Sequence, residues 1–169
     1  MQIIKYCMLF LVFILSSIIG NYIANGYILR LEELEEMKNA LNIFKTKIKF
    51  TYEPIPEIFE QIGKSSSKNI SNLFLNAKEK MKSLNTEISW DQAVDELKSN
   101  LNNEDKLVIK TLSKLLGTTD TEGQISQIEV TESFLEKQIR EAEEQKRKNE
   151  KLYKKLGATI GLAIVIILI

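Results

Sequence analysis

Two apolar stretches without charge lie at the two ends of the chain, and they constrain its fold more than any other feature. No charged residue stands between Lys5 and Arg30, and none follows Lys155 up to Ile169. About 20 apolar residues suffice for a transmembrane helix. We therefore predict a transmembrane helix over residues 3–28, a second and shorter one over residues 156–169, and a soluble domain over residues 30–153.

The first stretch also has the outline of a cleavable signal peptide, because Lys5 and an apolar run precede the small residues Ala24 and Gly26. The charges favour a retained anchor, since Lys and Arg flank both stretches on the side of the middle domain and basic flanks mark the cytoplasmic side. We expect a cytoplasmic middle domain. The alternative is a cleaved leader and an extracytoplasmic helical domain that binds envelope components or lipid.

A basic run precedes the second apolar stretch. Six of the ten residues from Lys146 to Lys155 are basic, namely Lys146, Arg147, Lys148, Lys151, Lys154 and Lys155. Lysine and arginine next to a membrane helix are attracted to anionic lipid. We interpret the run as a membrane-interface collar, with a docking site for a partner protein as the alternative.

The middle of the chain has a helical pattern throughout. Apolar residues recur three or four apart, as in Leu34, Met37, Leu41 and Phe44, and no alternation of period two persists. This pattern predicts an all-α fold, an antiparallel helical bundle with short connections.

Particular residues mark the helix boundaries and the core. Pro54 and Pro56 predict an extended elbow before a short helix that contains Phe59. Ser89–Gln92 has the spacing of a capping box and would open a helix that contains Trp90. We predict Pro54, Pro56, Phe59 and Trp90 to be core anchors.

The last long helix is preceded by a turn with its own signals. Gly117 best tolerates the left-handed conformation after a helix. Thr121 and Gln124 have capping-box spacing, which places the start of a helix near Glu122. We interpret Asp120 as a cap whose carboxylate faces free amides. A role of Asp120 in receiving a partner is the alternative.

Small residues in the two apolar stretches share one interval. Gly157 and Gly161 are four residues apart, as are Gly20 and Ala24. Such spacing lets helices approach closely in lipid. We predict an antiparallel hairpin in which Ala24 lies level with Gly157 and Gly20 with Gly161, although self-association between chains would use the same residues.

The composition gives little support for chemistry. The chain has no histidine and one cysteine, Cys7, so neither a disulfide nor a Cys/His zinc site can form within one chain. Its 23 basic and 23 acidic residues balance, whereas nucleic-acid binding requires a clustered basic excess. The pairs Asp91/Asp95 and Glu57/Glu60 have the spacing of solvated helix faces. We expect no enzyme activity, no cofactor, no metal and no nucleic-acid partner.

Four segments together resemble the stage III sporulation protein AB family. They are YEPIP followed by Phe59 and Ile62, the Trp90-x-x-Ala93 helix, LGTTDTEGQ, and EAEEQKRKNEKLYKKLG before the last apolar stretch. The resemblance covers essentially the whole chain. It implies a part in endospore development, in the machine that connects the mother cell to the forespore and includes a secretion-like AAA-type ATPase and ring-forming membrane proteins.

The resemblance also carries an expectation for the fold and location. The soluble domain of this family is similar to the cytoplasmic domain of the type II secretion platform protein F. By analogy, the chain would be a platform in the mother-cell membrane around the forespore, linking the ATPase to the channel rings. A homo-oligomer is compatible with that role.

Overall fold

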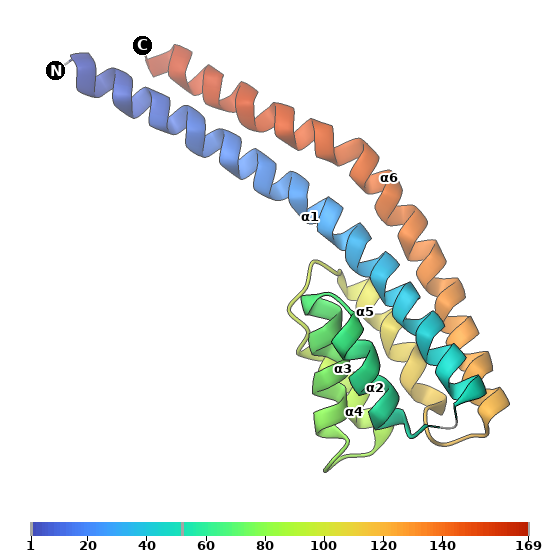
Figure 1. Ribbon diagram of the computed structural model, residues 1–169. Coiled ribbons are helices and arrows are strands. Elements are labelled where there is room, and N and C mark those ends of the chain that lie inside the picture. The colour runs from blue at the N-terminus through green and yellow to red at the C-terminus, as the bar shows by residue number, and fades with distance from the viewer. Residues whose placement is uncertain (1, 52, 169) are drawn as a thin grey trace. The chain divides into compact units, whose positions relative to one another are not determined.

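The structure, a computed structural model, describes residues 2–51 and 53–168, and every regular element in it is a helix (Figure 1). The elements are α1 (Gln2–Phe50), α2 (Ile55–Ser65), α3 (Lys68–Lys80), α4 (Thr86–Asp95), α5 (Asn103–Lys110), the 3-10 helix η1 (Thr111–Leu115) and α6 (Thr121–Leu168). No strand occurs among these residues. The predicted all-α fold is confirmed.

The chain divides into two compact units. Unit 1 contains the described residues up to Leu31 and from Glu141 onward, and unit 2 contains Glu32–Arg140. Residues 141–153, which the sequence assigned to the soluble domain, group with the apolar ends. They do so because α6 packs on the first part of α1 there, with Tyr153 stacked on Tyr27.

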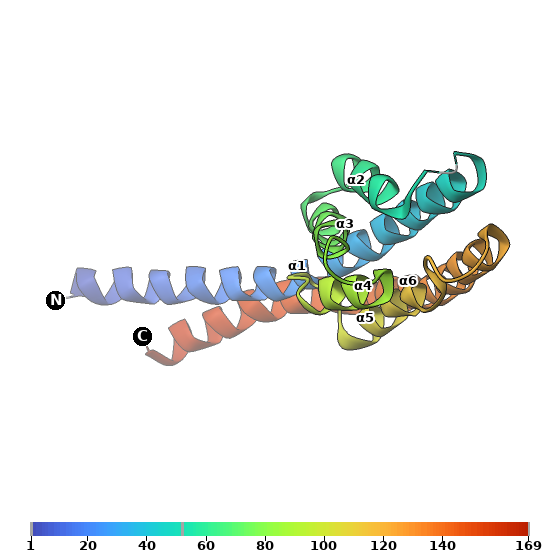
Figure 2. The same ribbon diagram turned by 90° about the horizontal axis from the view of Figure 1, so that it is seen from below.

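Within unit 2, α1 and α6 form an antiparallel pair. The side chain of Lys38 lies 2.8 Å from Glu136 and that of Lys45 lies 2.6 Å from Glu132. The inner stripe of α1 contributes Leu34, Met37, Leu41 and Phe44, all fully buried. Figure 2 shows α2 and α3 beside α1, and α4 and α5 toward α6.

An aromatic cluster forms the centre of unit 2. The ring of Phe59 lies 5.3 Å from Phe44, 5.0 Å from Phe74 and 5.3 Å from Trp90, measured between centroids. The indole nitrogen of Trp90 donates a hydrogen bond of 2.9 Å to the carbonyl of Ile109. Edge-to-face contacts and a satisfied indole are typical of a specific core. The cluster therefore connects all helices from α1 to α5.

The two prolines of the elbow do not belong to this core. Pro54 is exposed and Pro56 is only half-buried, so the prediction that they are core anchors was wrong. Pro54 precedes α2 with φ of −58°, and Pro56 lies in its first turn, where a missing amide hydrogen costs nothing. Their contribution is to the backbone. Tyr52, which the elbow was expected to include, lies outside the described residues.

The cap of α4 also differs from the prediction. Asn85 accepts a hydrogen bond of 2.8 Å from the amide of Ile88, and α4 begins at Thr86. Ser89 is buried in the next turn and caps nothing. Asparagine is at least as good a cap as serine, so a helix that begins at Thr86 is capped as well as the predicted one.

Candidate functional site

Unit 1 contains a contact between α1 and α6 in which the two backbones meet directly. A Cβ atom built on Gly20 would lie 2.8 Å from Cα of Gly157 and 2.6 Å from the carbonyl oxygen of Tyr153. A Cβ atom on Gly157 would lie 2.8 Å from the carbonyl oxygen of Ser16. Neither position has room for a side chain. The two backbones touch through glycine, as small residues permit in membrane helices.

Neighbouring residues extend this contact, which we call the seam, in both directions. The hydroxyl of Ser16 donates a hydrogen bond of 2.7 Å to the carbonyl of Gly157. A Cβ atom on Gly161 would lie 3.1 Å from the ring of Phe13 and from Cβ of Ser16. Ala24 is fully buried. Three of the four small residues singled out from the sequence, Gly20, Gly157 and Gly161, therefore lie in the seam, and the fourth, Ala24, is buried one turn further along α1.

The register of the seam is one helical turn away from the predicted one. Gly20 lies opposite Gly157, where the sequence argument placed Ala24. That argument took Ala24 and Gly157 to lie at the same depth, near the cytoplasmic interface. The structure instead aligns the polar ends of the seam, where the rings of Tyr27 and Tyr153 stack with centroids 5.9 Å apart. Arg30 also donates to the side chain of Gln145 at 2.9 Å.

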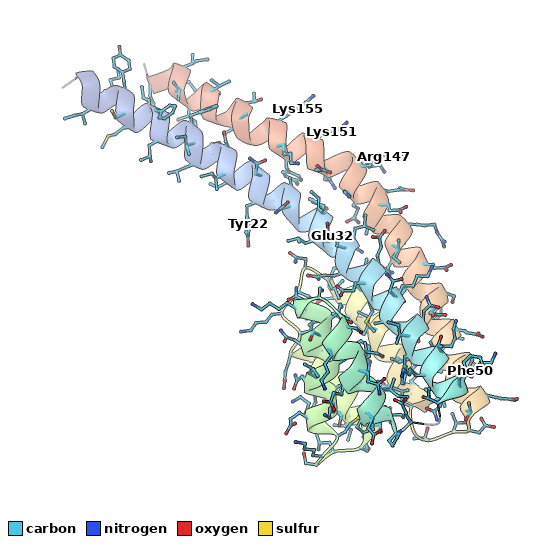
Figure 3. All side chains as sticks on the ribbon, viewed as in Figure 1. Tyr22, Glu32, Phe50, Arg147, Lys151 and Lys155 are labelled. Atoms are coloured by element: carbon cyan, nitrogen blue, oxygen red, sulfur yellow. The ribbon has the colours of Figure 1, made fainter. Side chains whose placement is uncertain are left out.

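The basic run lies on α6 beside this polar end. Lys148 pairs with Glu144 at 3.6 Å and Lys154 with Glu150 at 2.8 Å, each four residues apart on the same helix. The hydrogen bond from Lys154 holds the pKa of the Glu150 carboxyl below its usual value. Figure 3 shows Arg147, Lys151 and Lys155 on the side of α6 that faces away from α1. The remaining basic residue, Lys146, is half-buried.

The turn before α6 forms a cap with a different set of bonds from the predicted one. Gly117 has φ of +70°, the left-handed conformation. Asp120 accepts a hydrogen bond of 2.9 Å from the amide of Gly123, and α6 begins at Thr121. The side-chain amide of Gln124 donates to the carbonyl of Thr119 at 3.1 Å. Gln124 therefore does not pair with Thr121 in a capping box, because Asp120 already occupies the cap position.

Sequence reasoning missed one buried carboxylate, Glu33 on α1. It is 6% exposed, and it accepts hydrogen bonds of 2.7 Å from the side chain of Asn69 and of 2.9 Å from both the amide and the side chain of Asn100. It fixes the start of α3 and the loop after α4 to α1. A signal was present, since Glu33 lies four residues before Met37 on the buried stripe.

Unit 1 contains the apolar part of α1. Within the described residues, α1 is the helix long and apolar enough to cross a membrane, with a mean hydropathy of 2.1 in its most apolar window. Length and composition alone support this statement. The charge-free end of α6, which follows Lys155, is the shorter of the two apolar stretches.

The bundle of unit 2 and the apolar helix together define an all-helical protein with a segment able to anchor it in a membrane. The chain belongs to the stage III sporulation protein AB family, whose sequence profile matches residues 5–169. This membership implies a role in sporulation.

A curated relative and a solved structure agree with this assignment. Stage III sporulation protein AB of Bacillus subtilis (strain 168) is 26% identical over 153 residues, which cover 88% of this chain and 90% of the relative. A solved structure of a stage III sporulation protein AB has a TM-score of 0.63 at 22% identity and covers 70% of this chain and 96% of its own. The structural match shows a shared fold.

Proposed function

We propose that this chain is a membrane-anchored platform in the complex that connects the mother cell to the forespore, and that it is required for endospore development. The continuity of two helices carries the proposal. Both α1 and α6 run without a break from the apolar residues of unit 1 into the bundle of unit 2. The bundle is thus built from the same helices as the anchor, as a platform requires.

The seam gives the anchor its dimensions. Gly20 lies opposite Gly157, and the two helices are antiparallel. The basic run, which ends at Lys155, therefore lies level with the part of α1 that follows Gly20. The apolar arms are then residues 6–20 of α1 and 157–168 of α6, about 23 Å and 18 Å long at about 1.5 Å per residue. Both are shorter than a hydrocarbon core of about 30 Å. Local thinning of the bilayer and lysines that reach to the headgroups would accommodate such a hairpin.

The seam also favours a retained first segment over a cleaved leader. Ser16 and Gly20 contribute to the contact with α6, and Ala24 is buried one turn further along α1. Cleavage after Ala24 or Gly26 would remove these residues and leave the glycine face of α6 uncovered. The mass of the mature protein, isolated from sporulating cells of its own host, distinguishes the two cases directly.

The proposed partners are other channel proteins of the sporulation operon, including the secretion-like ATPase. Family membership and the fold support this part of the proposal. The platform acts by binding and takes no part in chemistry. Affinity purification of the full chain in mild detergent from sporulating cells should recover the ATPase, and recovery of envelope lipid without any channel protein would contradict the platform role.

Topology is the most direct test of the anchor. Ser83 is exposed after α3, so Ser83→Cys in a Cys7→Ser chain offers one thiol on the bundle. With the bundle in the mother-cell cytoplasm, an impermeant maleimide should label this thiol only after the cells are permeabilised. Equal labelling in intact and permeabilised cells would place the bundle outside and favour the extracytoplasmic alternative.

A further inference from the structure

One stripe of α1 in unit 1 has the spacing of a coiled coil and is uncovered. Its members are alternately four and three residues apart: Cys7, Leu11, Ile14, Ile18, Asn21 and Asn25. This is the a/d pattern of a heptad repeat, in which a and d positions of two helices meet. All six side chains are exposed, and the two asparagine side chains make no hydrogen bond within the described residues.

The stripe is distinct from the seam. With about 3.6 residues per turn, Ile18 and Gly20 point about 160° apart around the helix axis. Tyr22, which follows Asn21, is 82% exposed and points away from α6 in Figure 3. The glycine face of α1 is thus occupied by α6 of the same chain, and the opposite face is available to another helix.

We propose that the stripe binds the same stripe of a second copy of this chain, so that two α1 helices pack in parallel about a two-fold axis normal to the membrane. This rests on the membrane anchor proposed above, because two copies inserted in one orientation place every residue at the same depth. Asn21 then meets Asn21, and Asn25 meets Asn25. A carboxamide both donates and accepts, so each pair is self-complementary. Such a contact between identical patches is the commonest form of oligomer.

The asparagines and the apolar residues of the stripe contribute differently to the proposed contact. The seam places Asn21 and Asn25 near the level of the basic run, at the boundary of the membrane. Of the two, Asn25 stands at an a position, where a polar residue fixes register and oligomer state in coiled coils. Leu11, Ile14 and Ile18 lie deeper, where close packing and not the hydrophobic effect holds helices together. The next a position is the exposed Glu32, where two like charges would meet, so the contact ends before it.

The native cysteine provides the first test. Cys7 is exposed and occupies a d position, which faces its counterpart in a parallel pair. Oxidation of membranes that contain the full chain with copper phenanthroline should give a disulfide-linked dimer on a non-reducing gel, and Cys7→Ser should abolish it. In the Cys7→Ser chain, Ile18→Cys and Asn25→Cys should restore the dimer. The adjacent Ile19→Cys should give at least about fivefold less, because it leaves the stripe.

The asparagines are tested separately. The Asn21→Leu, Asn25→Leu double variant should lower the Cys7 dimer by about fivefold, since interhelical hydrogen bonds of this kind contribute modestly to association in membranes. An unchanged yield would overturn the asparagine pairing. Equal yields from Ile18→Cys and Ile19→Cys, a cross-link only to another polypeptide, or no cross-link at all would overturn the second copy as the occupant.

A carbonate wash of the same membranes separates this proposal from the anchor on which it rests. A chain that the wash releases contradicts the membrane platform itself. A chain that the wash leaves in the membrane but that gives no dimer contradicts the pairing of two α1 helices and leaves the membrane anchor intact.

Discussion

Unit 1 and unit 2 are held together in opposite ways. In unit 2 the core is built from large side chains, because Phe59 contacts three other aromatic rings and all four rings are fully buried. In unit 1 the centre is nearly empty of side chains, because the backbones at Gly20 and Gly157 meet directly. Unit 2 is held together by large buried side chains, whereas the contact in unit 1 requires positions without a side chain.

The membrane anchor proposed above accounts for the difference, because unit 1 would then lie in lipid and unit 2 in water. In water, burying apolar area stabilises a fold by about 25 cal/mol per Å², so large rings at the centre give the largest gain. Lipid offers no such gain, because it is as apolar as the side chains themselves. Close backbone approach and bonds such as Ser16 to Gly157 are then the main attractive terms. The contrast is consistent with the proposed membrane location of unit 1.

Truncation of the aromatic centre should give the largest effect. We expect Phe59→Ala to destabilise unit 2 by about 3–5 kcal/mol, the usual cost of removing a buried phenyl ring. Hydrogen exchange of the full chain in detergent should show faster exchange in α2, α3 and α4. Phe50→Ala is the matched control, since Phe50 is 67% exposed and labelled in Figure 3 at the end of α1. Equal effects of the two substitutions would mean that the cluster is not the centre of the fold.

The opposite change should destabilise unit 1. Gly20→Ala adds a Cβ atom that meets backbone at less than 3 Å, so the helices must separate, at about 1–3 kcal/mol. Gly26→Ala is the control, because nothing lies within 4 Å of its Cβ position and alanine favours a helix by up to about 1 kcal/mol. Exchange should rise in the last part of α6 for Gly20→Ala only. If both variants behave alike, the seam does not hold unit 1.

The same contrast explains what the sequence could predict. Helical periodicity located the elements, because a buried face repeats every three or four residues whichever partner covers it. The small residues of the seam were visible for a similar reason, since few residue types allow backbone contact. The register was not visible. A shift by one turn exchanges Ala24 for Gly20, and stacking of Tyr27 on Tyr153 decides between them.

Polar contacts between distant segments were also beyond the sequence. The position of Glu33 four residues before Met37 indicates that its side chain is buried, but its partners are 36 and 67 residues away. The cap of α4 is Asn85, one turn before the predicted Ser89. In both cases the outcome depends on which groups the fold brings together, and local spacing does not contain that information.

A smaller effect is expected at the turn before α6, where unit 2 begins its last helix. Asp120→Ala removes the acceptor for the amide of Gly123 and should cost about 1 kcal/mol. Thermal unfolding of the full chain measures the loss, and Asp120→Asn, which keeps an acceptor, should restore most of it. An unchanged melting temperature together with loss of a partner would assign Asp120 to docking.

The smallest effect concerns an ion pair on the surface of unit 2. Water screens this ion pair, whereas the aromatic cluster is buried. Glu60 lies 2.7 Å from Lys64 and 2.5 Å from Lys78, and bonds from these two ammonium groups lower the pKa of its carboxyl to about 2. A pKa lowered by folding stabilises the folded state above the unfolded value, and this contribution is lost as the pH falls through about 2. Because the carboxylate is accessible to water, the gain in folding stability is small.

Glu60→Gln should lower the melting temperature slightly at pH 7, and the difference in melting temperature from the unchanged chain should shrink between about pH 5 and pH 2. Glu57→Gln, one turn away and without an ion pair among the described residues, is the control. A difference for Glu60→Gln that grows as the pH falls would reverse the sign of the argument and remove the ion pair as its cause.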